Sequence, residues 1–229
     1  FSYFSFDSCS TPLYSNLFYR WLKSIKMKLY SSKFAPSPRK VLIYIAEKGI
    51  QDIEVIDIDL ASMEHKTPEY KAIAPNSRVP ALQLDDQTVI LETTAICRYL
   101  ECLYPEPNMF GESPMEIASI EMWYSRVSFE LMLPLVHGFR HTHPHMSQME
   151  NQNQEYGLAQ RDLGTKALAK YEEIMSSKQY IAGDRFTYAD LQMTTSLQFL
   201  VGLNKLNIQD YKNLNEYVNM VSSRPSFSQ

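Results

Sequence analysis

Residues 78–82 (RVPAL) place a proline at the start of a predicted strand. The peptide bond before a proline costs little to adopt the cis form, and a strand start beside it has main-chain groups free to pair with an extended peptide. The alternative is a proline that only opens an edge strand. The pattern therefore indicates a main-chain binding edge at Val79 and Pro80.

Glu92 and Thr93 lie between a predicted strand and a predicted helix. The first turn of a helix offers unpaired N–H groups and the positive end of the helix dipole to a carboxylate, and Glu92 can pair with an ammonium. Thr93 can also cap the helix, because its hydroxyl and its N–H are separate groups. We favour a ligand-binding role for this pair.

Four histidines, His137, His141, His143 and His145, lie within nine positions of one another. Alternating histidines can bind zinc on a strand. Here they follow a predicted helix, a proline interrupts them, and no Cys or carboxylate accompanies them before Glu150. We interpret them as surface or cleft lining and predict no metal site.

The composition of the 229 residues is typical of a globular protein, with 45% hydrophobic and 21% charged residues. A net charge of -4 without a basic cluster argues against nucleic-acid binding, and no apolar run is long enough to cross a membrane. Three cysteines without tight spacing, Cys9, Cys97 and Cys102, argue against a disulfide framework. They favour a reducing compartment, the cytoplasm.

Residues 28 to 58 show a strand, a helix and a strand in sequence. Residues 28–31 are a short strand candidate, and apolar residues at helical spacing run from Pro38 to a C-cap at Gly49. Residues 53–58 alternate apolar and polar side chains, as a strand does. So short a unit predicts a right-handed βαβ arrangement with parallel strands.

A hairpin and a helix are predicted to follow. Residues 79–84 and 88–91 are strand candidates separated by the turn 85–87, and residues 92–104 have helical spacing. With a helix expected between the second and third strands, the order is strand, helix, strand, helix, strand, strand, helix. This order predicts an α/β thioredoxin-like N-terminal domain.

Beyond a linker at 105–113, which contains proline and glycine, only helical patterns occur. The chain from 114 to 229 is therefore predicted to be an all-α helical-bundle C-terminal domain. Within it, Thr187 and Asp190 have the spacing of a capping box. The helices are expected at 114–139, 154–176, 187–203 and 210–223.

Residues 1–26 begin with Phe, are rich in Ser, Phe and Tyr, and lack the pattern of a secretory signal. Met27 is followed at once by the first strand candidate. We interpret 1–26 as upstream translation or an unstructured extension outside the fold, with a transit peptide as the alternative. The first domain is then 27–104.

From Met27 onward, these motifs and their order resemble those of cytosolic glutathione transferases of a bacterial-like class. The resemblance covers nearly all of the chain beyond that residue. It implies glutathione as co-substrate, with no metal. It also implies a homodimer in which the first domain of one subunit contacts the helical domain of the other.

The resemblance also implies how glutathione is bound. In the family, the residue before a cis-proline, here Val79 before Pro80, pairs its main chain with the cysteinyl unit. Glu92 and Thr93 match the positions that hold the γ-glutamyl end.

Basic or amide side chains at three further positions reach the glycyl carboxylate in related transferases. Here these positions hold His65, Lys66 and Arg78. The alternative for His65 and Lys66 is a charged helix start that faces solvent.

Transfer requires the glutathione thiolate, because the thiol is only a few per cent ionised at neutral pH. A donor at the N-terminus of the first helix can lower the pKa of the sulfur, at about 1.4 kcal/mol per unit. The family's usual Ser or Cys position falls on Ala35. The predicted catalytic residue is therefore Ser37, with Tyr30, Ser31 and Ser32 as alternatives.

The helix 114–139 is expected to line a pocket for the second substrate. The sequence predicts conjugation of glutathione to a hydrophobic electrophile. A glutathione-dependent disulfide or peroxide reductase and a non-catalytic binding protein are the alternatives. The pocket candidates are Trp123, Tyr124 and Phe129, with Arg126 and Phe139 as further ones.

Overall fold

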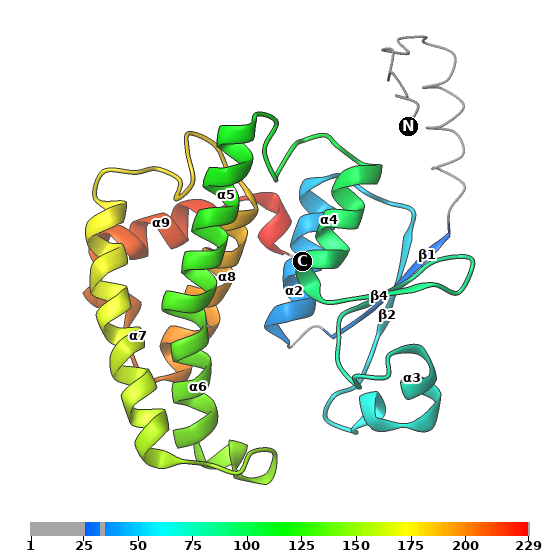
Figure 1. The fold of residues 1–229 in the computed structure, drawn as a ribbon, viewed down its shortest axis with the longest axis horizontal. Helices are drawn as coiled ribbons and strands as arrows, with labels where there is room; N and C mark the ends of the chain where they lie inside the picture. The colour runs from blue at the N-terminus through cyan, green and yellow to red at the C-terminus, as the bar shows by residue number, and fades with distance from the viewer. Residues whose placement is uncertain (1–25, 33–34, 229) are drawn as a thin grey trace, which may run out of the picture.

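The computed structural model describes residues 26–32 and 35–228, and Figure 1 shows their arrangement. Apart from Lys26, the interpreted extension 1–26 lies outside these residues. None of the described helices combines the length and the apolar character that crossing a membrane requires.

A four-stranded mixed sheet organises the first half of the chain. Strand β1 (Met27–Ser31) lies parallel to β2 (Ile53–Asp57) and antiparallel to β3 (Ala81–Gln83), which pairs with β4 (Val89–Leu91). The strand order is β2-β1-β3-β4. The parallel pair with a helix between its strands is the βαβ unit that the hydrophobic periodicity predicts.

Helices cover both faces of this sheet. Helices α2 (Pro36–Glu47) and α4 (Thr93–Leu103) lie on one face, and α3 (Pro68–Ile73) lies towards the other (Figure 1). The alternation along β1 sends Leu29 into the apolar cluster of α2 and α4, and Tyr30 into the cluster that includes α3. The predicted thioredoxin-like order is confirmed, with the short 3₁₀ turn η1 (Glu64–Lys66) before α3.

Two local features refine the predicted bounds. β3 begins at Ala81, because the cis Val79-Pro80 bond lies ahead of the strand. Gly49 follows α2 with φ of +64°, a left-handed conformation that glycine adopts without a Cβ penalty. The predicted C-cap is therefore present.

The second half of the chain is entirely helical. As Figure 1 shows, its helices pack beside the sheet domain, with α7 antiparallel to α6. The elements are α5 (Pro114–Arg126), η2 (Val127–Met132), α6 (Leu133–Thr142), η3 (Pro144–Gln148), α7 (Gln154–Met175), α8 (Tyr188–Leu203), η4 (Ile208–Asp210), α9 (Lys212–Ser222) and η5 (Pro225–Ser228).

The segment η2 is a π-helical turn where the sequence predicts uninterrupted helix. Pro134 has no N–H for the carbonyl of Glu130, and its ring would clash with that carbonyl in a regular α-helix. A wider turn immediately before the proline removes this conflict. Helices α5 and α6 therefore continue each other through a local change of pitch.

Helix α8 forms the centre of the helical domain. Its residues are buried without interruption from Tyr188 to Leu197, and it packs against α2, α5, η2, α6 and α9. A helix buried on all sides carries no amphipathic signal. Its N-terminus is fixed by the predicted capping box, which the structure confirms.

Asp190 satisfies the groups around the start of α8. One carboxylate oxygen accepts hydrogen bonds from the main-chain N–H (2.9 Å) and hydroxyl (2.8 Å) of Thr187. The other accepts from the N–H of Ile181 (2.8 Å) and the hydroxyl of Tyr217 (2.9 Å). The side chain is fully buried, so this carboxylate ties a loop, α8 and α9 together.

Helix α2 is held by residues from the far end of the chain. Glu47 accepts two hydrogen bonds from Arg224, at 2.7 and 2.8 Å, and one from the hydroxyl of Ser226. Arg39 donates to Gln198 of α8 at 2.9 Å. Because α2 also packs on α4, it belongs to the interiors of both domains.

The structure thus has the predicted sheet domain followed by a helical domain. The boundaries 27–104, 105–113 and 114–229 stay a prediction.

We expect Asp190→Ala to lower the free energy of unfolding by about 3 kcal/mol or more, because four buried donors lose their acceptor. Urea unfolding followed by circular dichroism measures this. Asp184→Ala, which removes an exposed carboxylate from the same loop, is the matched control and should change little. Equal effects of the two substitutions would contradict the structural role of Asp190.

Candidate active site

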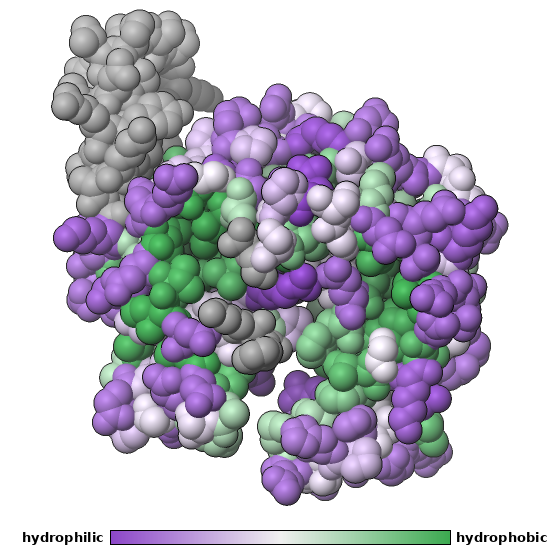
Figure 2. Space-filling model, turned by 180° about the vertical axis from the view of Figure 1, so that it is seen from behind, coloured by the Kyte–Doolittle hydropathy of each residue, from purple (hydrophilic) through white to green (hydrophobic). Residues whose placement is uncertain are grey.

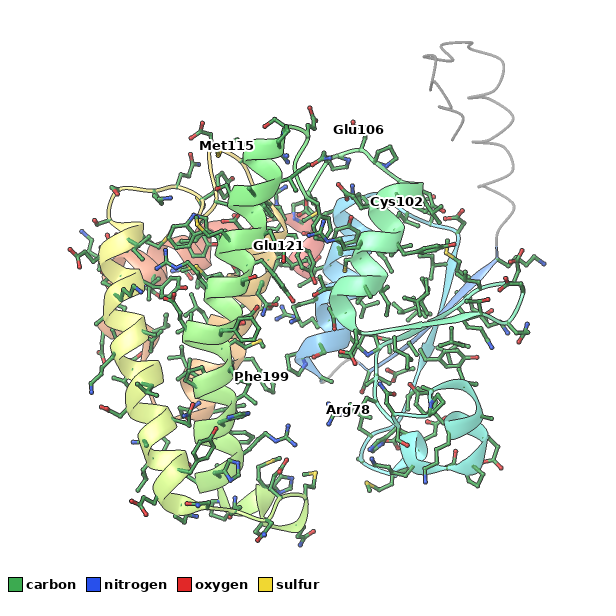
Figure 3. All side chains as sticks on the ribbon, viewed as in Figure 1. Arg78, Cys102, Glu106, Met115, Glu121 and Phe199 are labelled. Atoms are coloured by element: carbon green, nitrogen blue, oxygen red, sulfur yellow. The ribbon has the colours of Figure 1, made fainter. Side chains whose placement is uncertain are left out.

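A cavity of about 420 Å³ lies where α2 meets α6 and α8. The first domain lines it with Ser37 and Lys40 of α2 and with Arg78 from the loop before β3. Figure 2 shows a notch between the two domains with apolar surface on both sides, and in Figure 3 Arg78 and Phe199 flank the gap. The opposite wall is mostly apolar: Met132, Val136, Phe139, Phe199 and Leu200.

The first turn of α2 concentrates its donors on one residue. Pro36 and Pro38 have no N–H, and the N–H of Arg39 is bonded to the carbonyl of Ala35 at 3.2 Å. Among the described residues, Ser37 therefore holds the one unpaired main-chain N–H of this turn, beside its own hydroxyl. Ala35 occupies the N-cap with extended backbone, and its side chain has no oxygen that could accept from the Ser37 N–H.

The N-termini of α2 and α4 are adjacent. The hydroxyl of Thr93 donates to the carbonyl of Ser37 at 3.4 Å, which brings two predicted site residues together. Glu92 precedes α4 with an exposed side chain and φ of +70°. No side chain in the described part of the chain caps this helix, so its first N–H groups are open to an anion.

The loop before β3 has the geometry expected of a main-chain binding edge. The Val79-Pro80 bond is cis, and the hydroxyl of Tyr70 donates to the carbonyl of Arg78 at 2.7 Å, which fixes the loop. Val79 lies before β3, and its main-chain N–H and carbonyl have no main-chain partner among the described residues. Pro80 is buried, whereas the Arg78 side chain is exposed at the cavity.

His65 and Lys66 lie in η1 and do not line the cavity. The Nδ1 atom of His65 is buried and has no hydrogen-bond partner among the described residues. Burial, and then the charge of Lys66, lowers the pKa of this imidazole. Lys66 itself is exposed, as the solvent-facing alternative predicts.

The three pocket candidates on the first long helix lie outside the lining of the cavity. Trp123 is buried and packs edge-on against Tyr171, and the hydroxyl of Tyr124 is hydrogen-bonded to Thr94 at 2.6 Å. Phe129 is largely exposed. The packing of this helix decides which of its faces meets the first domain. The sequence of the helix alone does not specify that packing. Phe139 does line the cavity.

Lys40 is a cavity residue that the sequence does not single out. Its side chain is 8% exposed, and its ammonium donates to the Oε1 atom of Gln192 at 2.7 Å. Burial lowers the pKa of this ammonium to about 8. Cys97 of α4 is the nearby titratable group, and burial raises the pKa of its thiol to about 12.

The alternative sulfur-activating residues are packed away. Tyr30 is buried and its hydroxyl donates to Gln83 at 3.0 Å. Ser31 and Ser32 are buried at the end of β1, and the Ser31 hydroxyl has no partner among the described residues. None of the three lines the cavity.

The histidine cluster makes ordinary local contacts. His137 is hydrogen-bonded to the hydroxyl of Tyr156 at 2.6 Å, and His141 accepts from the N–H of Asn153 at 3.1 Å. Across residues 26–32 and 35–228, no three His, Cys, Asp or Glu side chains are grouped so that they could hold a metal ion.

Comparison with known proteins identifies the family. A family model described as "Glutathione S-transferase, N-terminal domain" matches residues 34–103, and one described as "Glutathione S-transferase, C-terminal domain" matches residues 128–225. Glutathione S-transferase 2 of Saccharomyces cerevisiae is 33% identical over 205 residues, 88% of each chain. The chain belongs to the glutathione S-transferase family and is an enzyme of that family.

Solved structures agree with this assignment. The crystal structure of Gtt2 from Saccharomyces cerevisiae is 31% identical with a TM-score of 0.78, and the match covers 88% of this chain and 98% of that one. A glutathione transferase homologue from Sulfitobacter, solved with bound glutathione, is 21% identical with a TM-score of 0.73. That match covers 88% of this chain and 95% of the homologue, and it supports the fold.

The buried Lys40 makes the stability of the protein depend on pH in a defined direction. Its folded pKa of about 8 lies below the ordinary value of 10.5, so the unfolded chain binds the extra proton between these values. Stability from this group is therefore lowest below pH 8 and rises towards pH 10.5. Lys40→Met removes this dependence.

We compare the free energy of unfolding of Lys40→Met with that of wild type. We expect this difference, variant minus wild type, to be about 2 kcal/mol larger at pH 7 than at pH 10. The pH-independent loss of the Gln192 hydrogen bond cancels between the two pH values. Urea unfolding of both proteins at the two pH values measures it. Lys71→Met, at an exposed position, should show no such change with pH. An equal stability difference between Lys40→Met and wild type at the two pH values would show that Lys40 is not buried as a cation.

Proposed function

We propose that this enzyme conjugates the thiolate of glutathione to a hydrophobic electrophile. The observation that carries the proposal is the cavity itself. The hydroxyl and the unpaired N–H of Ser37 lie on one side of it, and an apolar wall from α6 and α8 lies on the other. A sulfur placed beside Ser37 would face an electrophile held against that wall.

Glutathione binding is supported by groups that remain unused within the described structure. The γ-glutamyl end would occupy the start of α4 at Glu92 and Thr93, and the cysteinyl unit would pair with the main chain of Val79. Arg78 would bind the glycyl carboxylate from the edge of the cavity. The Sulfitobacter homologue, which has the same fold, was solved with bound glutathione, and this supports glutathione as the proposed ligand.

His65 and Lys66 remain proposed ligands of the glycyl carboxylate, from η1. The buried, unpaired Nδ1 atom of His65 supports a role for the imidazole. The exposure of Lys66 fits a weaker contact at the rim.

Ser37 is the proposed sulfur-activating residue. A hydroxyl and an N–H that both donate to sulfur favour the thiolate, and the N-terminus of α2 adds the positive end of the helix dipole. The close contact between Thr93 and the Ser37 carbonyl supports this position for the sulfur, because it joins the two proposed glutathione contacts. Ala35 at the N-cap is what supports the alternative, a binding protein without catalysis.

We expect Ser37→Ala to lower kcat/KM for glutathione with chlorodinitrobenzene at least about tenfold, because one unit of thiolate pKa is worth a factor of ten. Ser37→Thr keeps a hydroxyl and should retain most of the rate. Steady-state assays, with glutathione affinity from calorimetry, separate binding from transfer. Full activity of Ser37→Ala would exclude Ser37 as the activating residue; binding without transfer in the wild type would favour the non-catalytic alternative.

A homodimer is part of the proposal, and a stripe of exposed apolar side chains supports it. Met115, Met122, Phe129 and Leu133 recur along the continuous stretch of α5, η2 and α6, and Phe129 is 69% exposed. Side chains at such intervals lie on one side of a helix. Apolar surface of this kind is typical of a subunit interface.

Phe129→Asp is expected to weaken the dimer by at least about 30-fold in Kd, equivalent to about 2 kcal/mol, because a charge replaces an apolar anchor. Sedimentation equilibrium measures the constant. Val55→Asp, at an exposed apolar position on β2, is the control and should keep the wild-type mass. A monomeric wild type, or equal dissociation of both variants, would contradict this interface.

We further propose a detoxification role in the cytoplasm. The free thiols of Cys97 and Cys102 support a reducing location. The mostly apolar wall, which would suit hydrophobic electrophiles, supports detoxification.

A further inference from the structure

Lys40 lines the cavity, and among the described residues its ammonium has no counterion. It is buried, yet its side chain contributes to the lining. Its ammonium has one described hydrogen bond, to the neutral amide oxygen of Gln192, and no carboxylate of the described residues pairs with it. Since an ammonium carries three N–H groups, two have no partner among the described residues.

The amine is held in a fixed position. The Nε2 atom of Gln192 donates to the hydroxyl of Ser128 at 3.1 Å, and that hydroxyl donates to the carbonyl of Tyr124 at 2.7 Å. This chain of donors leaves the Gln192 oxygen directed at Lys40. Ser128 belongs to the π-helical turn, a feature that occurs often at functional sites.

Lys40 and Ser37 lie on the same side of α2. They are three positions apart along the helix, a rise of about 4.5 Å. Both line the cavity, and no carboxylate does. An electrophile that meets the sulfur beside Ser37 would therefore share the cavity with the Lys40 side chain.

We propose that Lys40 is a catalytic residue that donates a proton to an α,β-unsaturated carbonyl substrate as the glutathione thiolate adds to it. The inference rests on the proposed conjugation and names a substrate class for it. The cavity fits such a substrate, because its wall is mostly apolar while Lys40, its buried cation among the described residues, suits a developing oxyanion.

The step balances without any further reactant. The thiolate forms a carbon–sulfur bond at the β-carbon, the carbon–carbon π bond breaks, and its electrons move to the carbonyl oxygen as an enolate. The Lys40 ammonium gives one proton to the enolate oxygen, and the resulting enol tautomerises to the saturated carbonyl product. The neutral amine regains a proton when the next glutathione thiol ionises.

The acidity of Lys40 suits this role. A general acid is most effective when its pKa lies near the working pH, and burial brings the pKa of Lys40 to about 8. The other charged or titratable groups around it are Cys97 of α4, Arg78, and Arg140 of α6, which is paired with Glu150. The thiol of Cys97 has a pKa of about 12, and arginine stays charged, so neither competes for this proton.

The test compares two electrophiles with wild type and Lys40→Met, which keeps an unbranched side chain of similar length. Addition to benzylideneacetone needs a proton, whereas substitution of chlorodinitrobenzene releases chloride and needs none. We expect kcat/KM to fall about 100-fold or more with benzylideneacetone, and less than about tenfold with chlorodinitrobenzene. Equal losses, or no loss with benzylideneacetone, would overturn the proposal.

Gln192→Glu is the second variant, and it reports on pH. A carboxylate beside the amine raises its pKa, so the alkaline decline of the benzylideneacetone rate, expected near pH 8 in wild type, should move to higher pH. The chlorodinitrobenzene profile should not move with it. An unshifted decline would show that Lys40 is not the titrating acid.

A binding measurement keeps the proposal testable if the wild type turns over neither electrophile, an outcome that would defeat the proposed conjugation by itself. Hydrocinnamate carries a carboxylate where the enolate oxygen would lie. Calorimetry in two buffers at pH 8 should show proton uptake on binding to wild type, and at least about tenfold weaker binding without uptake for Lys40→Met. Identical binding by the two proteins, or none by wild type, would overturn the role of Lys40.

Discussion

The packing of α2 between α4 and α8 is the constraint on which the rest of the structure depends. One side of this helix completes the core of the sheet domain, and the other enters the interior of the helical domain. Its first turn and its next turn supply Ser37 and Lys40 to the cavity. The active site is therefore a product of the contact between the domains, and neither domain contains it alone.

Two buried ionisable groups near this contact differ in how completely their neighbours satisfy them. Asp190 accepts hydrogen bonds from four donors, which offset part of its burial cost, and it acts as a structural tie; burial still raises the pKa of this carboxyl. Lys40 has a single described acceptor, a neutral amide. A buried ammonium that is paired only with a neutral group lowers the stability of the free protein. A bound anion would stabilise this charge. The difference separates an architectural residue from a functional one.

The sequence predicts the fold well because local patterns determine it. Alternation in β1 and β2, the positive-φ glycine after α2 and the Thr187–Asp190 capping box each depend on a few neighbouring residues. The loop at Val79 is predicted for the same reason.

The walls of the cavity are harder to predict. Lys40 next to Arg39 reads as a charged helix surface, but in the structure it is buried and its partner Gln192 lies 152 positions away in the sequence. Phe129 reads as a pocket residue, but in the structure it lies in η2 outside the cavity lining and is largely exposed.

The attachment of α2 to the far end of the chain has a consequence for how the protein is made. Glu47 binds Arg224 and Ser226, which are 177 and 179 positions later in the sequence. On a ribosome, the sheet domain emerges while one surface of α2 still lacks both α8 and these partners. Contacts of such long separation also form late in folding. Completion of translation, rather than formation of the first domain, therefore sets the moment at which the enzyme becomes competent.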